Sequence, residues 1–167
     1  MGVAAEPIAQ ARIKRLRYVE SVLLWEGIIQ RQRVCNVFGV TANHVTKDLR
    51  MYCAAHPGGI EFQPRLRGYV ASKKFKPVYA SDDPNEYLAL LQAQAETGSA
   101  ALMPMLGSEG LSCDALPQPS HSIDRTVLRC VIQAMRGSTG IDIVYNSMSS
   151  DKPSERTLWP HSLLHSG

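Results

Sequence analysis

The sequence predicts an α+β protein in three parts, at residues 1–80, 81–122 and 123–167. In the first part, three segments with helical spacing of apolar residues precede two short alternating segments that are typical of strands. Charge divides the chain at nearly the same point. Residues 1–80 hold 13 Lys and Arg against 5 Asp and Glu, whereas residues 81–167 hold 5 against 10. A basic half joined to an acidic half indicates that the first half meets a polyanion.

Two helices are expected before residue 40. Residues 8–26 carry apolar side chains at spacings of three and four, and Gly27 follows as a stop signal. Residues 31–38 form a shorter amphipathic segment that ends at Gly39. Glycine adopts the positive φ that a tight turn between two helices requires. The pattern therefore predicts a helical hairpin with its turn at Gly39.

A third helix is expected from Thr41, as its N-cap and a candidate DNA contact, to about His56. Its buried stripe would consist of Val45, Leu49 and either Tyr52 or Cys53. The opposite face would then expose four polar or basic side chains: Asn43, His44, Lys47 and Arg50. Asn pairs with adenine, and Lys or Arg with guanine or phosphate, so these residue types suit a helix that reads the major groove.

Residues 60–72 alternate apolar side chains around a central bend, which predicts a β-hairpin. Three helices followed by a hairpin is the element order of a winged helix-turn-helix domain. Arg65 and Arg67 lie near the tip of the hairpin, where they could reach an adjacent groove or the phosphate backbone. Arg12 and Arg15 on the first helix could add further backbone contacts.

The second half begins with a helix at 84–97, followed by residues 98–122, which are too apolar for a solvated linker and predict a packed loop. Together these two segments are a helical connector and the expected dimer surface. Helical spacing returns at 124–137, and two strands are expected within 140–150 and 154–164.

Known catalytic motifs are absent from the sequence. It contains no Gly-x-Ser-x-Gly, no His-Glu-x-x-His and no glycine-rich phosphate loop, so we expect a protein that is not an enzyme and uses no cofactor or metal. Cys53 and His56 could share a metal, but core packing is the expected role. His161 and His165, four residues apart, are a weak metal signal.

The cysteine pattern and the N-terminus indicate a cytoplasmic, nucleoid-associated protein. The four cysteines are widely spaced and form no Cys-x-x-Cys pair. Residues 1–20 lack the apolar core of a secretory signal, and no apolar run approaches the roughly 18 residues that a membrane-spanning helix needs.

Several segments resemble one known family. "FGVTANHVTKDLR" resembles the recognition segment of DeoR-like winged-helix repressors. Taken with "LRYVESVLLWEG", "GYVASKKFKPVYASDDPNEYLALL" and "LPQPSHSIDRTVLRCVIQAMRGSTGIDIVYNSMSS", it is similar to bacterial WYL-domain transcriptional regulators of the type found beside phage-defence gene clusters. The resemblance covers almost the whole chain.

The resemblance implies a homodimeric repressor with an N-terminal winged helix, a helical connector and an Sm-like β-barrel that senses a nucleotide or nucleic-acid effector. It implies operator contacts by Asn43, His44, Lys47, Arg65 and Arg67. It also matches Tyr145, Ser147 and His161 to positions that line the ligand groove of the family. Family members continue beyond this point into the Trp-Tyr-Leu segment, and we therefore expect a chain truncated within the WYL domain, with about two strands of the barrel.

The expected function is that of a sequence-specific DNA-binding transcriptional regulator, a dimeric repressor that occludes a promoter, of a phage-defence locus. The alternative is a dimerising or ligand-sensing remnant of a WYL regulator with little specific DNA binding. Salt dependence separates the two, because several phosphate contacts make the affinity fall steeply as salt rises.

Overall fold

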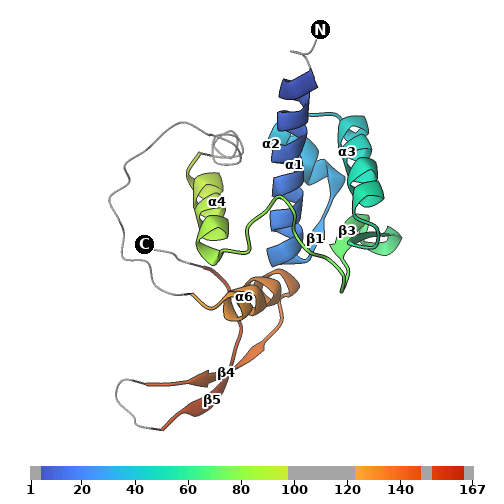
Figure 1. Cartoon of the computed structure of the whole chain (residues 1–167). Helices are drawn as coiled ribbons and strands as arrows, with labels where there is room; N and C mark the ends of the chain where they lie inside the picture. Colours follow the sequence, from blue (N-terminus) through green and yellow to red (C-terminus); the bar gives the residue numbers. More distant parts are fainter. Residues whose placement is uncertain (1–4, 98–122, 148–151, 164–167) are drawn as a thin grey trace.

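The computed structural model describes residues 5–97, 123–147 and 152–163. It has the predicted α+β character, with helices on two sides of a long central helix and two small antiparallel sheets (Figure 1). The packed loop expected at 98–122 lies outside the described residues.

Three helices form the N-terminal bundle: α1 (Ala5–Glu26), α2 (Arg31–Phe38) and α3 (Ala42–Ala55). All three were predicted, and α1 begins three residues earlier than its apolar periodicity indicated. Gly27 ends α1 with a φ of 82° and Gly39 ends α2 with a φ of 61°. Both glycines thus adopt the left-handed conformation that their positions as helix stops require.

A three-stranded antiparallel sheet packs against this bundle in the order β1-β3-β2. Its strands are β1 (Ile28–Ile29), β2 (Ile60–Gln63) and β3 (Gly68–Ala71), and the 3-10 turn η1 (Pro64–Leu66) joins the last two. The hairpin was predicted, but β1 was not, because two residues carry no alternation to detect. Gly68 permits the pairing, since a Cβ there would lie 3.0 Å from both Ile28 Cγ1 and the Ile29 carbonyl oxygen.

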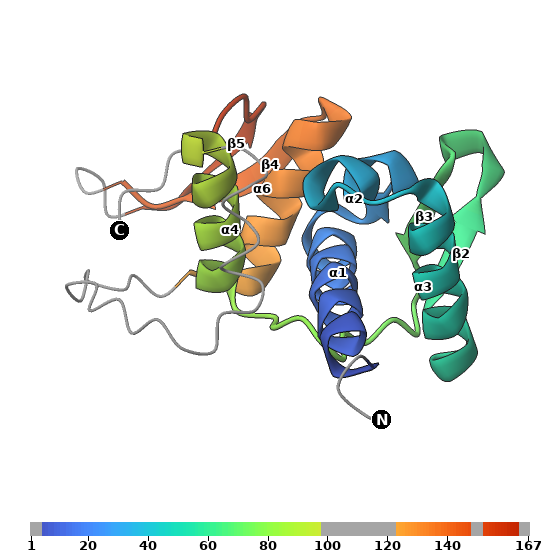
Figure 2. The ribbon, with the colours of Figure 1, turned by 90° about the horizontal axis from the view of Figure 1, so that it is seen from above.

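Two hydrophobic cores meet along α1. The first lies between α1, α2, α3 and the three-stranded sheet, and its most buried members include Val22, Leu23, Ile29, Val34 and Val45. The second surrounds Trp25, which is fully buried. The buried part of the predicted apolar stripe of α1 lies in the first core, whereas Trp25 and its neighbour Leu24 reach the second. Helix α1 thus has packing partners on two sides (Figure 2).

The second core is completed by α4 (Pro84–Thr97) and α6 (Arg125–Gly137). The ring of Tyr87 stacks on Trp25 with centroids 5.4 Å apart, and Leu128 and Ile132 of α6 close the cluster. Tyr87 and Leu88, on the helix that we expected to mediate dimerisation, are only 4% and 3% exposed within a single chain. That face of α4 is thus already covered.

A two-stranded hairpin follows α6, formed by β4 (Ile141–Tyr145) and β5 (Ser154–Leu158). Both strands were predicted, although they are shorter than expected. They pair antiparallel, with Ile141 opposite Leu158 and Tyr145 opposite Ser154. The hairpin extends away from the helices (Figure 1), and every residue of β5 is exposed.

Candidate nucleic-acid interface

One side of α3 presents a polar and basic face. Five of the predicted DNA contacts are exposed on the helix or at its N-cap: Thr41, Asn43, His44, Lys47 and Arg50. The opposite face is fixed in the first core, where Val45 and Leu49 are 1% and 2% exposed. Figure 2 shows α3 at the edge of the molecule, on the side of α1 away from α4 and α6. The structure thus brings these side chains together on an outer surface, as the helical spacing predicted.

Thr41 occupies the predicted N-cap position of α3, but its hydroxyl does not accept a hydrogen bond from a backbone N–H of the helix. Instead Thr41 Oγ1 lies 2.8 Å from His44 Nδ1. The two side chains therefore form one hydrogen-bonded unit at the start of the helix. Its effect is to restrict the orientation of the His44 ring on the exposed face.

The turn before α3 has the geometry of a helix-turn-helix. The Val40 N–H donates to the Cys35 carbonyl at 3.3 Å, and the N–H of Gly39 bonds to the same oxygen. Cys35, Phe38 and Val40 all pack against the first core. The small Cys35 and the positive φ of Gly39 let the turn stay tight while its flanking residues remain anchored.

An arginine of α2 extends this surface and was missed by the sequence analysis. Arg31 is exposed at the first position of α2, and its Nη1 donates to Thr46 Oγ1 at 3.0 Å. Thr46 also donates to the Ala42 carbonyl at 2.8 Å. The basic character of Arg31 was visible in the sequence, but its position beside α3 depends on the packing of the two helices.

Ion pairs between α1 and α3 hold the candidate reading helix in place. Arg15 Nε donates to Asp48 Oδ2 at 2.7 Å, and Arg12 Nε lies 3.8 Å from Asp48 Oδ1. The side chains of Arg15 and Asp48 are only 13% and 10% exposed. We expected Arg12 and Arg15 to contact the DNA backbone, whereas the structure gives Arg15 a packing role that orients α3 on α1.

A buried carboxylate joins α1, α3 and the segment that follows the β2–β3 hairpin, which is the wing of the domain. Glu20 is 0% exposed, and it accepts hydrogen bonds from the Tyr52 hydroxyl at 2.7 Å and from the backbone N–H groups of Val78, Tyr79 and Ala80 at 2.6–2.9 Å. Burial, and next the bonded Glu20, raise the pKa of the Tyr52 phenol. The single side chain of Glu20 thus holds both the C-terminal half of α3 and the backbone of residues 78–80 against α1.

The wing carries both predicted arginines on its exposed tip. Arg65 lies in η1, and Arg67 follows it with a φ of 48°, a left-handed conformation that is uncommon for a residue other than glycine. The Arg67 N–H donates to the Pro64 carbonyl at 3.2 Å. Behind the tip, the rings of Phe62 and Tyr69 lie 5.2 Å apart across the two strands and stiffen the hairpin.

The three predicted effector contacts lie on or after the C-terminal hairpin. Tyr145 is at the end of β4, 42% exposed, with the Arg156 guanidinium 4.6 Å from its ring centroid. Ser147 lies two residues further on and is partly buried. His161 follows β5 and lines a hollow of about 230 Å³ with residues that include Met135 and Trp159.

The described residues contain no group of three or more His, Cys, Asp or Glu placed to hold a metal ion. Cys53 packs against the first core, and the His56 ring lies 4.9 Å from that of Tyr52, in keeping with the packing role expected for the pair. His165 lies outside the described residues. Within the described ranges, no helix combines the length and hydropathy needed to cross a membrane.

The N-terminal part of the chain matches a known family of protein domains. Residues 12–93 match the family model of the BrxR transcriptional regulator winged helix-turn-helix domain. This range runs from α1 through the wing into α4, and it contains every residue of the basic surface described above.

Similar proteins extend the match over most of the chain. DNA-binding transcriptional repressor CapW of Escherichia coli (strain KTE188) is 30% identical over 159 residues, which are 92% of this chain and 51% of the relative. CapW of Pseudomonas aeruginosa is 27% identical, and that of Stenotrophomonas maltophilia 26%, each over 154 residues with the same coverage. The chain spans about half the length of these curated relatives. Together with the fold, the comparisons support a WYL-family helix-turn-helix regulator whose residues 12–93 match BrxR-type winged helix-turn-helix domains.

Proposed function

We propose that the protein is a sequence-specific DNA-binding transcriptional regulator that represses a promoter by occluding it. The observation that carries the proposal is the exposed face of α3, where Asn43, His44 and Lys47 project from a helix that is anchored on its other side. The names of the relatives, which are DNA-binding transcriptional repressors, support it.

The side chains fall into two groups by the contacts that they are suited to make. Asn43, His44 and Lys47, in the first half of α3, would meet base edges in the major groove. Arg50 and the wing residues Arg65 and Arg67 would bind phosphates, which positions the domain without reading sequence. Thr41 would act through its hydrogen bond to His44.

The regulator would act by binding alone, as a cytoplasmic, nucleoid-associated homodimer. Two winged helices related by a two-fold axis would occupy half-sites about one helical turn, or a multiple of it, apart. The locus controlled would be one for phage defence, in line with the family resemblance. Sedimentation analysis of the purified chain tests the dimer, and a purely monomeric species at micromolar concentration would contradict it.

DNA binding is tested by fluorescence anisotropy with the duplex upstream of the protein's own reading frame and with a shuffled duplex, over a salt series. We expect tighter binding to the upstream duplex. Lys47→Ala should lower that affinity by about 1–3 kcal/mol and reduce the discrimination. Arg67→Ala should weaken binding to both duplexes and reduce the salt slope by about 1.

Arg125→Ala is the matched control, because it removes the same charge from the exposed start of α6, outside the proposed DNA surface and the proposed effector contacts. It should leave both affinities unchanged. Equal and weak binding of the parent chain to the two duplexes at physiological salt would overturn the repressor proposal. That outcome would favour the alternative of a ligand-sensing or dimerising remnant.

We also propose that Tyr145, Ser147 and His161 contact a nucleotide or nucleic-acid effector. The support is an exposed aromatic ring beside a cation, Arg156, which is a combination that stacks on bases and binds phosphate. Titration with a short oligothymidylate tests it. Tyr145→Ala should weaken binding severalfold, and equal affinities of the parent and the variant would exclude a stacking role for this ring.

A further inference from the structure

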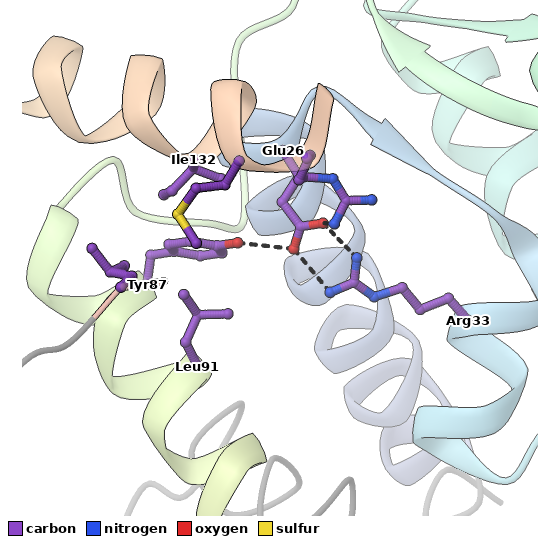
Figure 3. Close-up of a pocket in the computed structure, with 8 residues that line it drawn as sticks. Glu26, Arg33, Tyr87, Leu91 and Ile132 are labelled. Carbon is purple, nitrogen blue, oxygen red and sulfur yellow. Dashed lines mark hydrogen bonds and ion pairs between the residues drawn. The ribbon is translucent and has the colours of Figure 1, made fainter. Parts of the chain in front are cut away.

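A pocket of about 470 Å³ lies where four helices meet (Figure 3). Glu26 of α1, Arg33 of α2, Tyr87 of α4 and Arg136 of α6 supply its polar lining. Its volume falls within the range of about 300–1,000 Å³ that is usual for small-molecule sites. The proposed DNA contacts include none of these four residues.

The buried carboxylate of Glu26 is bonded to each of the other three polar side chains of the pocket. Glu26 receives two hydrogen bonds from Arg33, at 2.5 and 2.8 Å, one from the Tyr87 hydroxyl at 2.8 Å, and an ion pair from Arg136. Figure 3 shows Glu26 between Arg33 and Tyr87. Two guanidinium groups therefore share a single negative charge, and the pocket keeps an excess positive charge.

The two arginines differ in how firmly they are held. Arg33 also donates from Nε to the Tyr18 hydroxyl at 2.8 Å, and its hydrogen bonds to Glu26 raise its pKa against the opposing effect of burial. Arg136 contacts Glu26 through Nη1, and its side chain is 45% exposed. A guanidinium has five N–H donors, so Arg136 can bind a second anion without leaving the pocket.

The remaining lining is apolar and comes from α4, α6 and the segment after β5: Leu91, Ile132, Met135 and Leu163. Leu91 and Ile132 belong to the core cluster around Trp25, so they offer a fixed wall. A few convergent charged groups against such a wall are the usual composition of a site for an amphiphilic small molecule.

We propose that this pocket binds a small organic anion, with a carboxylate or phosphate group paired to Arg136 and an apolar body against Leu91, Ile132 and Met135. The site is distinct from the effector contacts proposed on the hairpin. Ligand binding stands independently of DNA binding, whereas its consequence for the operator rests on the proposed function. An anion that draws Arg136, and then Arg33, from Glu26 weakens the link that this carboxylate of α1 makes between α6 and α2, the helix that precedes the turn at Gly39.

Binding is tested with the fluorescent apolar anion 1-anilinonaphthalene-8-sulfonate, displaced at constant ionic strength by phenyl phosphate, benzoate, benzyl alcohol or inorganic phosphate. Phenyl phosphate and benzoate should displace the dye at concentrations at least tenfold lower than benzyl alcohol or inorganic phosphate. The ratio of the displacing concentrations of phenyl phosphate and benzoate shows which anionic group the pocket prefers. Equal displacement by benzyl alcohol would overturn the proposal, since the arginines would then make no contribution.

Arg136→Gln provides the decisive variant, because Glu26 keeps its bonds to Arg33 and Tyr87 when Arg136 is replaced. It should weaken the binding of phenyl phosphate at least tenfold, and Arg125→Gln, the matched control at the exposed start of α6, should not. Unchanged affinity in Arg136→Gln would also overturn the proposal. A saturating anion should shift the DNA affinity of the parent chain severalfold, and no shift despite anion binding would refute the coupling alone.

Discussion

Replacing Glu20 is the sharpest test of how this domain is held together. The carboxylate is fully buried and accepts hydrogen bonds from three successive backbone N–H groups, of Val78, Tyr79 and Ala80, and from the Tyr52 hydroxyl. We expect Glu20→Ala to be strongly destabilising and Glu20→Gln to be mildly so, because only the first removes the acceptor.

The magnitudes follow from the donors left without a partner. In Glu20→Ala, four donors lose their acceptor at about 1 kcal/mol or more each, which gives about 3–5 kcal/mol of lost unfolding free energy. In Glu20→Gln, the amide oxygen can take the place of Oε2, the atom that accepts all three backbone bonds. The loss of charge assistance is partly offset by the easier burial of a neutral group, so about 1–2 kcal/mol is expected.

The assay is urea unfolding followed by far-ultraviolet circular dichroism, with Glu61→Ala as control. Glu61 lies exposed on β2, and its replacement should change the free energy of unfolding by less than about 0.5 kcal/mol. Equal losses in the Gln and Ala variants would refute the argument, because the negative charge rather than the acceptor geometry would then be the source of stability.

Three further outcomes are expected. Gly39→Ala should cost about 1 kcal/mol in the same assay, solely from the φ of 61°, because an added Cβ meets nothing within 4 Å; no change would mean that the turn relaxes. Arg15 and Asp48 should show a coupling energy of about 1–2 kcal/mol in a double-mutant cycle with Arg15→Gln and Asp48→Asn, and additivity would exclude their ion pair as a stabilising contact. Burial raises the pKa of the Tyr52 and Tyr87 phenols, so the stability that the neutral phenols contribute is present below pH about 10 and is lost as the pH rises further. The free energy of unfolding of Tyr87→Phe should therefore fall less steeply with pH in the alkaline range. An unchanged slope would contradict this.

Local patterns were sufficient for every described α-helix, for the two hairpins and for the surface of α3, but not for β1. Apolar spacing predicted α1, α2 and α3, because a helix buries one stripe whatever its partner is. Gly39 predicted the turn, and the alternation around residues 60–72 predicted the wing. Once Val45 and Leu49 are placed inside, helical geometry alone turns Asn43 and Lys47 outward.

Pairing between distant segments was decided only by the tertiary structure. Arg15 and Asp48 are 33 residues apart along the chain, and Glu20 and Val78 are 58 apart. A charged residue in a helix looks the same in sequence whether it faces water, DNA or a buried partner, which is why Arg15 was expected to contact phosphate. The same reason concealed the role of Glu26, since the convergence of Arg33, Tyr87 and Arg136 on one carboxylate exists only after α1, α2, α4 and α6 have packed together.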